Sequence, residues 1–328
     1  MGNRTTIAGA GKNESEFSTR RAPYPDRYIM TLLLGIALGL LTAFCQCFSY
    51  VFSRIFVIRH RSAFWNLLLV SHLYIGLISA LGLCFIWPET LPPLSQYILP
   101  LLGTAGFYVV GQGGLFVLMR MENPSRVAPL LGTKIIILAI LATLVFGQHL
   151  TALQWLAVAA CFGAVLVMNF SGKRLSINAL GVLLLTCTGY SLSDLNIGRL
   201  VQALSNLSTL YAAIWGALMA YVILGGISAI ITLATRPKAL FTDWKLSLPF
   251  AALWLTAMLT LFTCIGLVGP VFAIILQSTR GLMSVVLGVF IAKYGWLTVE
   301  QYVPRRMLAQ RIAAAVLMVA AVALYALA

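Results

Sequence analysis

Ten runs of mostly apolar residues follow one another along this chain of 328 residues, and each is about long enough to cross a bilayer as a helix. Short connections rich in Pro, Gly and charged residues separate the runs. Because no connection has room for a soluble domain, any function must be built from the helices themselves. We predict an all-α integral membrane protein with helices at 29–52, 67–87, 97–119, 124–146, 153–170, 178–198, 209–234, 248–268, 270–292 and 310–328.

The composition agrees with a membrane protein. Hydrophobic residues make up 61% of the chain and charged residues only 9%, with a mean hydropathy of +0.96, which lies outside the range of soluble domains. The net charge of +14 would suggest nucleic-acid binding in a soluble protein. Here most Lys and Arg residues fall between the apolar runs, which is typical of loops at a membrane surface. All six cysteines lie within apolar runs, so neither a disulfide framework nor a metal site is indicated.

The sequence repeats itself at an offset of 146 residues. "PSRVAPLLGTK" at 124–134 is echoed by "PVFAIILQSTR" at 270–280, and each stretch begins with Pro and ends in Thr followed by a basic residue. The same offset relates Tyr108 to Trp254 and Gly35 to Gly181. With one residue of slippage, "LTALQW" at 150–155 matches "LTVEQY" at 297–302. An ordered series of this kind predicts an internal duplication.

The duplicated unit would hold five helices, which fixes how the two copies cross the membrane. We predict a polar basic tail over 1–28 without a cleavable signal peptide, a first repeat over 29–172 and a second over 177–328. Because five is an odd number, the second copy must cross in the opposite sense. Inverted repeats of this kind are typical of secondary transporters, in which the substrate site lies near the midplane between the halves.

Two basic residues lie inside the apolar runs, where an ionisable group is expensive and functional by default. Lys134 and Arg280 each follow ten residues after the Pro that opens their run. At about 1.5 Å per residue both charges would lie roughly 15 Å deep. We interpret them as a pair that faces a central cavity and neutralises a carboxylate or phosphate of the substrate. The alternative is that one or both pair structurally with Asp194, the acidic residue that we place within a span.

Four further residues complete the predicted substrate site. Asp194 is a candidate proton-coupling carboxylate or a counter-ion that the substrate displaces, unless it lies at the membrane interface near Arg199. Tyr108 and Trp254 occupy matched places in the third and eighth runs, and Gln112 lies one turn beyond Tyr108. Aromatic walls and an amide suit a small organic substrate. Packing or anchoring at the interface is the other interpretation of the two aromatic residues.

One segment resembles a known family. The stretch "FGQHLTALQWLAVAACFGAVLVMN" at 146–169 combines a turn of the form G-x-x-L-T-x-x-Q with a helix of small residues, after an apolar fourth helix. In these features the chain resembles the EamA branch of the drug/metabolite transporter superfamily. The resemblance implies ten helices in two inverted repeats, with the third and eighth helices lining the cavity. Sugar-phosphate translocators of the same superfamily are similar in fold and use basic residues on the corresponding helices.

We therefore predict a secondary transporter of the cell membrane that moves a small, anionic organic metabolite by alternating access, without a cofactor and driven by a coupling proton or an exchange substrate. The alternative is an exporter of amino acids or other neutral metabolites in which Lys134 and Arg280 are structural. A membrane-embedded enzyme or receptor would need a clustered nucleophile, a metal site or a soluble module, and the sequence has none. The excess of basic residues in alternate connections favours termini outside, whereas the basic tail and the family habit favour cytoplasmic termini.

Overall fold

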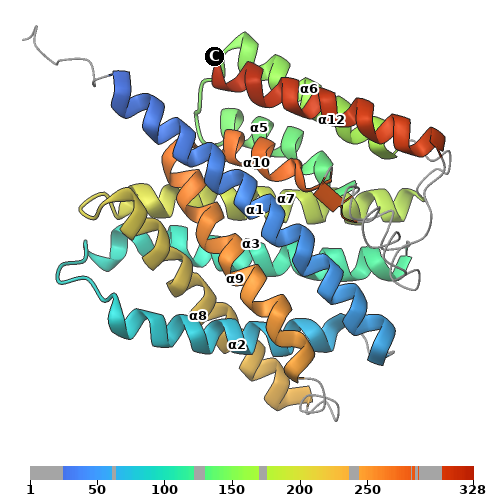
Figure 1. Ribbon diagram of the computed structural model, residues 1–328. Coiled ribbons are helices and arrows are strands. Elements are labelled where there is room, and N and C mark those ends of the chain that lie inside the picture. Colours follow the sequence, from blue (N-terminus) through green and yellow to red (C-terminus); the bar gives the residue numbers. More distant parts are fainter. Residues whose placement is uncertain are drawn as a thin grey trace, which may run out of the picture.

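The computed structural model describes residues 25–60, 64–121, 130–169, 176–235, 244–281, 283–284, 287 and 305–328. These residues form helices and no strands, as predicted, and each predicted run overlaps one helix (Figure 1). The elements are α1 (Pro25–His60), α2 (Phe64–Phe85), α3 (Leu94–Met121), the 3₁₀ turn η1 (Leu131–Thr133), α5 (Lys134–Leu144), α6 (Ala152–Asn169), α7 (Ile177–Ala203), α8 (Thr209–Thr235), α9 (Trp244–Val268), α10 (Pro270–Ser278) and α12 (Arg305–Ala326).

Six of these helices are long and apolar enough to cross a membrane, namely those within α1, α2, α3, α7, α8 and α9. The described parts of α5 and α10 have 11 and 9 residues, and residues 122–129 and most of 285–304 lie outside the description. The first helix is longer than predicted. It runs on to His60 instead of ending at 52, because the segment after it contains neither Pro nor Gly to stop the helix.

The turn between α5 and α6 explains the motif G-x-x-L-T-x-x-Q in physical terms. Gly147 has a φ of +64°, and the N–H of Gln148 donates to the carbonyl of Ala142 at 2.9 Å, so a glycine in the left-handed region closes the end of the helix. Three residues later, Thr151 and Gln154 cap α6 reciprocally: each backbone N–H donates to the other's side-chain oxygen, at 3.0 and 3.2 Å. The motif therefore ends one helix and begins the next. Its second copy, at 297–302, lies outside the described residues.

The helices pack in pairs that join the first part of the chain to the second. The most extensive contacts are those of α3 with α7 and of α1 with α9, followed by α2 with α8 and α6 with α12, and Figure 1 shows α6 and α12 side by side. Small residues let the backbones approach. A Cβ on Gly76 would lie 2.6 Å from the Cα of Gly225 where α2 crosses α8, and a Cβ on Gly189 would lie 2.8 Å from the backbone nitrogen of Gly111 where α7 crosses α3.

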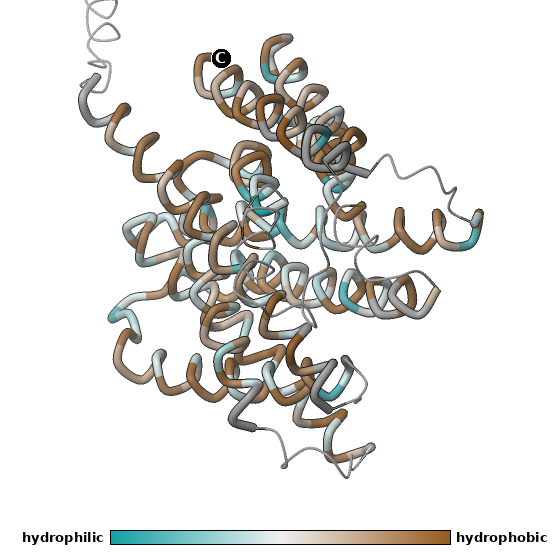
Figure 2. The backbone as a smooth tube through the Cα atoms, turned by 45° about the vertical axis from the view of Figure 1, so that its right-hand side comes forward, coloured by the Kyte–Doolittle hydropathy of each residue, from teal (hydrophilic) through white to brown (hydrophobic). Residues whose placement is uncertain are grey.

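The outer surface of the bundle is apolar. Large apolar side chains are exposed on several helices, including Leu99 at 74%, Leu144 at 78% and Ile230 at 69%. Figure 2 shows apolar residues along most of the helical tube, with hydrophilic positions chiefly at helix ends, in connections and at some interior places. A soluble monomer rarely exposes so much apolar surface. The bundle is therefore that of a membrane protein, whose outer side chains meet lipid.

Candidate functional site

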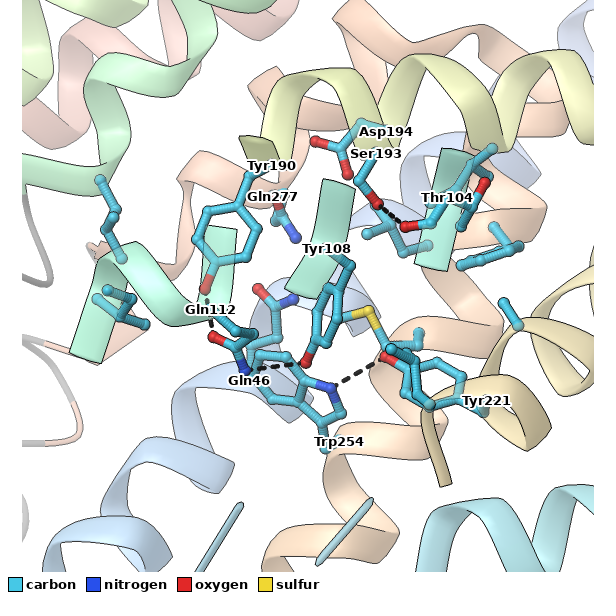
Figure 3. A pocket seen from close by; sticks show the side chains of 18 of the residues that line it. Gln46, Thr104, Tyr108, Gln112, Tyr190, Ser193, Asp194, Tyr221, Trp254 and Gln277 are labelled. Carbon is cyan, nitrogen blue, oxygen red and sulfur yellow. Dashed lines mark hydrogen bonds between the residues drawn. The ribbon is translucent and has the colours of Figure 1, made fainter. Parts of the chain in front are cut away.

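One pocket inside the bundle is lined by all six residues that the sequence singled out. Its walls come from α1, α2, α3, α5, α7, α8, α9 and α10, and the space between them is about 870 Å³, counting the part open to solvent. The part of this space that a water-sized sphere can occupy is only about 70 Å³, so the pocket is narrow in this state. Figure 3 shows side chains from several helices converging on it. The structure thus brings together Lys134, Arg280, Asp194, Tyr108, Trp254 and Gln112, while their role in binding a substrate stays a prediction.

Lys134 is the first residue of α5 and its charge is fully engaged. Its Nζ lies 2.8 Å from Oδ2 of Asp194 on α7 and donates to Oε1 of Gln277 on α10 at 3.0 Å. The ammonium group also lies 5.9 Å from the centre of the Tyr190 ring. The side chain is buried, as a charge can be only when it is paired. The interpretation that a cation pairs with Asp194 therefore applies to Lys134.

Asp194 lies within the bundle and not at an exposed helix end. It is 6% exposed, and α7 continues beyond it to Ala203. The placement near Arg199 at an interface is not what the structure shows. The Arg199 guanidinium instead lies over the ring of Phe146, 3.9 Å from its centre, at the end of α5. Asp194 is thus available as the counter-ion of Lys134 within the pocket.

Arg280 follows α10 and has only neutral partners among the described residues. Its Nη1 donates to Oε1 of Gln46 at 3.0 Å and to the hydroxyl of Tyr50 at 3.4 Å, both on α1. Its guanidinium lies 5.7 Å from the centre of the Tyr50 ring. No carboxylate in the described part of the chain lies within ion-pair distance of it. Arg280 therefore brings an uncompensated positive charge to the pocket.

The two cations have similar local backbones. Each follows a threonine whose hydroxyl donates to the carbonyl three residues earlier, Thr133 to Leu130 and Thr279 to Leu276, both at 2.7 Å. Such side-chain bonds compete with the helix ladder. The backbone tightens there, into η1 before Lys134 and into a turn at the end of α10. Both cations therefore lie at a break in a short helix.

A chain of neutral hydrogen bonds crosses one wall of the pocket (Figure 3). The Tyr190 hydroxyl donates to Oε1 of Gln112, and Nε2 of Gln112 donates to the Tyr108 hydroxyl at 3.0 Å. The Tyr108 oxygen is 3.1 Å from Nε2 of His72, whose Nδ1 donates to the Leu68 carbonyl at 2.9 Å. A neutral imidazole that donates through Nδ1 must accept at Nε2, so Tyr108 donates to His72. The chain fixes both Tyr108 and Gln112.

An aromatic cluster lies next to this chain and carries one indole hydrogen bond, and its Tyr221 ring centre is 6.4 Å from that of Tyr108. Nε1 of Trp254 donates to the Tyr221 hydroxyl at 3.1 Å, and both residues are buried. The Trp254 ring stacks on Phe250 with centres 5.7 Å apart and meets Tyr50 edge-on at 6.2 Å. Tyr108 and Trp254, matched in the sequence repeat, thus both face the pocket.

Sequence reasoning missed several residues of this site. Gln46 and Gln277 are amides within apolar runs, which is a signal that could have found them. The tyrosines carry no such signal, because aromatic residues are common in membrane helices. The missed residues are Gln46, Tyr50, His72, Tyr190, Tyr221 and Gln277.

The electrostatics of the pocket follow from three charged groups. Among the described residues that line it, these are Lys134, Arg280 and Asp194, which leave a net charge of +1. No group of three His, Cys, Asp or Glu side chains suited to a metal ion occurs in the described part of the chain. The pocket combines the guanidinium of Arg280, the neutral polar groups around Gln112 and the aromatic rings around Trp254. Such a combination can bind a small organic molecule.

The fold and the pocket define a class of protein, a polytopic helical membrane protein with a polar cavity inside its bundle. Residues 33–170 match the family model described as the EamA-like transporter family. The chain carries an EamA-like transporter region, and the family assignment made from the sequence is confirmed over these residues. This region indicates a membrane transporter of small molecules.

The comparisons with other proteins add the fold alone. No curated protein matches the sequence. Among solved structures 28 chains match, and one of them, described only as "Crystal structure of protein", has a TM-score of 0.60 at 12% identity, covering 92% of this chain and 96% of its own. At that identity the likeness concerns the arrangement of the helices and not the substrate.

Proposed function

We propose that this protein is a secondary transporter of the cell membrane that carries a small anionic organic metabolite by alternating access. The observation that carries the proposal is the uncompensated charge of Arg280 inside a pocket lined by helices from both parts of the chain. A partly buried cation inside a membrane bundle is costly when no carboxylate pairs with it, and an anionic substrate would remove that cost. Lys134, Asp194, Tyr108, Gln112 and Trp254 would complete the binding site.

The pattern of helix contacts supports an inverted repeat with boundaries at 29–172 and 177–328. In such a repeat α1 corresponds to α7, α3 to α9 and α5 to α10. The contact of α3 with α7 then corresponds to that of α9 with α1, and the contact of α5 with α7 to that of α10 with α1. All four contacts occur. The helices α2 and α8 are counterparts of each other, as are α6 and α12, and the members of each pair are in contact. The breaks before Lys134 and Arg280 lie on corresponding helices, as in transporters that bind substrate at interrupted helices.

Energy for transport would come from a gradient or from exchange. Asp194 is then a candidate coupling carboxylate, because a substrate anion at Lys134 would compete with it. That competition would couple substrate binding to the binding of a proton or of a counter-substrate.

A second candidate is an exporter of amino acids or other neutral metabolites. It is favoured by one observation, the complete pairing of Lys134 with Asp194 and Gln277, which makes this cation a structural one. Under this candidate Arg280 would also be structural, held by Gln46 and Tyr50.

The test is ligand-induced thermal stabilisation of the purified full chain with small carboxylates, phosphates, amino acids and cationic drugs. A ligand that binds the folded state at 100 times its Kd stabilises it by about 2.7 kcal/mol. We expect an anion to raise the Tm, Arg280→Ala to abolish the shift, and Arg280→Lys to weaken binding by about 10- to 100-fold, because Lys loses the planar fork. Arg199→Ala, outside the pocket, is the control.

The proposal fails if only neutral or cationic compounds stabilise the protein and Arg280→Ala leaves that response unchanged. That result would support the neutral-metabolite exporter.

A further inference from the structure

The two cations of the pocket have similar surroundings that differ in charge, although Lys134 also reaches Gln277 and Arg280 also reaches the Tyr50 hydroxyl. Each lies on the short, broken helix of one half and reaches an oxygen on the first helix of the other half. The distances are 2.8 Å from Lys134 Nζ to Asp194 Oδ2 and 3.0 Å from Arg280 Nη1 to Gln46 Oε1. The oxygen near Lys134 belongs to a carboxylate, and the oxygen near Arg280 belongs to an amide.

A tyrosine ring lies near each cation. Lys134 lies 5.9 Å from the ring centre of Tyr190, and Arg280 lies 5.7 Å from that of Tyr50. Tyr190 precedes Asp194 by four residues, whereas Tyr50 follows Gln46 by four, so the two tyrosines are not equivalent positions of the repeat. The two sites therefore share their kinds of group, a cation, a side-chain oxygen and an aromatic ring, but not the positions of the rings.

We propose that Gln46 sets the charge of the substrate. The Gln46 amide is the partner of Arg280, as the Asp194 carboxylate is the partner of Lys134, but the amide carries no charge. The pocket therefore keeps one net positive charge, which a monoanion would neutralise. This inference rests on the proposed function and narrows it. Gln46 is a specificity-determining residue: it positions Arg280 by a hydrogen bond but does not neutralise its charge.

The physical reason lies in the difference between an amide and a carboxylate. Gln46 is 1% exposed, so its oxygen orients the guanidinium without competition from bulk water. An amide oxygen accepts one hydrogen bond without cancelling the charge, whereas a carboxylate would form an ion pair like that of Lys134. In the described part of the chain only Nη1 of Arg280 donates hydrogen bonds, so the guanidinium keeps further N–H donors for an anion.

Gln46→Glu is nearly isosteric and tests this directly. The probes share one ring and differ in charge: benzamide is neutral, benzoate a monoanion and phthalate a dianion, and small aliphatic carboxylates of each charge form a second series. We expect wild type to bind monoanions best, and Gln46→Glu to bind them about 10- to 100-fold more weakly while its affinity for neutral probes is retained.

Three variants separate charge from shape. Gln46→Met removes the hydrogen bond but leaves the net charge, so it should keep the preference for monoanions. Asp194→Asn raises the net charge and should shift the preference towards dianions, which keeps the inference testable if Gln46→Glu does not fold. Gln154→Glu adds the same charge on the exposed cap of α6 and should change no affinity.

The outcomes distinguish the two levels of the proposal. If no anion binds wild type, the proposed function fails and the inference fails with it. If monoanions bind wild type and Arg280→Ala abolishes binding, but Gln46→Glu and Asp194→Asn leave the charge preference unchanged, the proposed function stands and the role of Gln46 is refuted. A wild type that prefers dianions or neutral probes also refutes it.

Discussion

Removal of either partner of the Lys134–Asp194 ion pair should destabilise the protein far more than removal of both. The two charged atoms are 2.8 Å apart and the side chains are only 10% and 8% exposed. With an effective dielectric constant of about 20, two unit charges at that distance attract by roughly 6 kcal/mol. Desolvation offsets much of this attraction, but a single truncation leaves a buried charge without its partner. We expect Lys134→Met and Asp194→Leu each to lower the free energy of unfolding by about 3–5 kcal/mol.

The double variant Lys134→Met/Asp194→Leu replaces the pair by apolar groups of similar size and should come within about 1 kcal/mol of wild type. The assay is chemical unfolding in lipid-containing detergent, analysed as a double-mutant cycle. Gln277→Leu removes one hydrogen bond to Lys134 but leaves the pair, so its loss should be smaller, about 1.5–3 kcal/mol. Additive losses for the two single variants would refute the reasoning, because they would mean that the two charges do not stabilise each other.

Two further predictions concern packing and the aromatic cluster. Gly76→Ala should lower the free energy of unfolding by about 1–3 kcal/mol in the same assay, because its Cβ would meet the Gly225 backbone. Gly226→Ala, with open space around it, should be neutral or slightly stabilising. Equal losses at both positions would contradict a close backbone contact at Gly76. Tyr221→Phe should cost about 1–3 kcal/mol, since it leaves the buried N–H of Trp254 unpaired. Adding Trp254→Phe should then cost little more, and a full second loss would show that the hydrogen bond does not couple the two residues.

The class of the protein and the positions of its helices could be predicted from the sequence, because lipid imposes a simple rule. Every backbone polar group in a bilayer must be satisfied within a helix, so runs of apolar residues reveal helices directly. The turn at Gly147 and the cap formed by Thr151 and Gln154 are equally local. Their hydrogen bonds join residues only a few positions apart, so a short sequence motif is enough to predict them.

The end of α1 and the breaks before the two cations were less predictable. The basic segment after residue 52 was interpreted as a connection, but it contains no Pro or Gly and continues the helix to His60. The breaks coincide with side-chain bonds of Thr133 and Thr279 to carbonyls three residues earlier, but Ser49 makes the same kind of bond within the unbroken α1. Threonine occurs in many membrane helices without breaking them, so the residue type alone does not predict a break.

By itself, the sequence determined that the chain is a helical membrane protein with an EamA-like region and that Lys134 and Arg280 are cations within apolar runs, and it predicts a repeat at an offset of 146. Only the tertiary structure decided their partners. Lys134 meets Asp194 and Arg280 meets Gln46 across 60 and 234 residues, at an offset of 148 between the two oxygens instead of 146. Such contacts depend on how two helices turn and slide against each other, and a slide of less than one turn changes the partner of a buried charge.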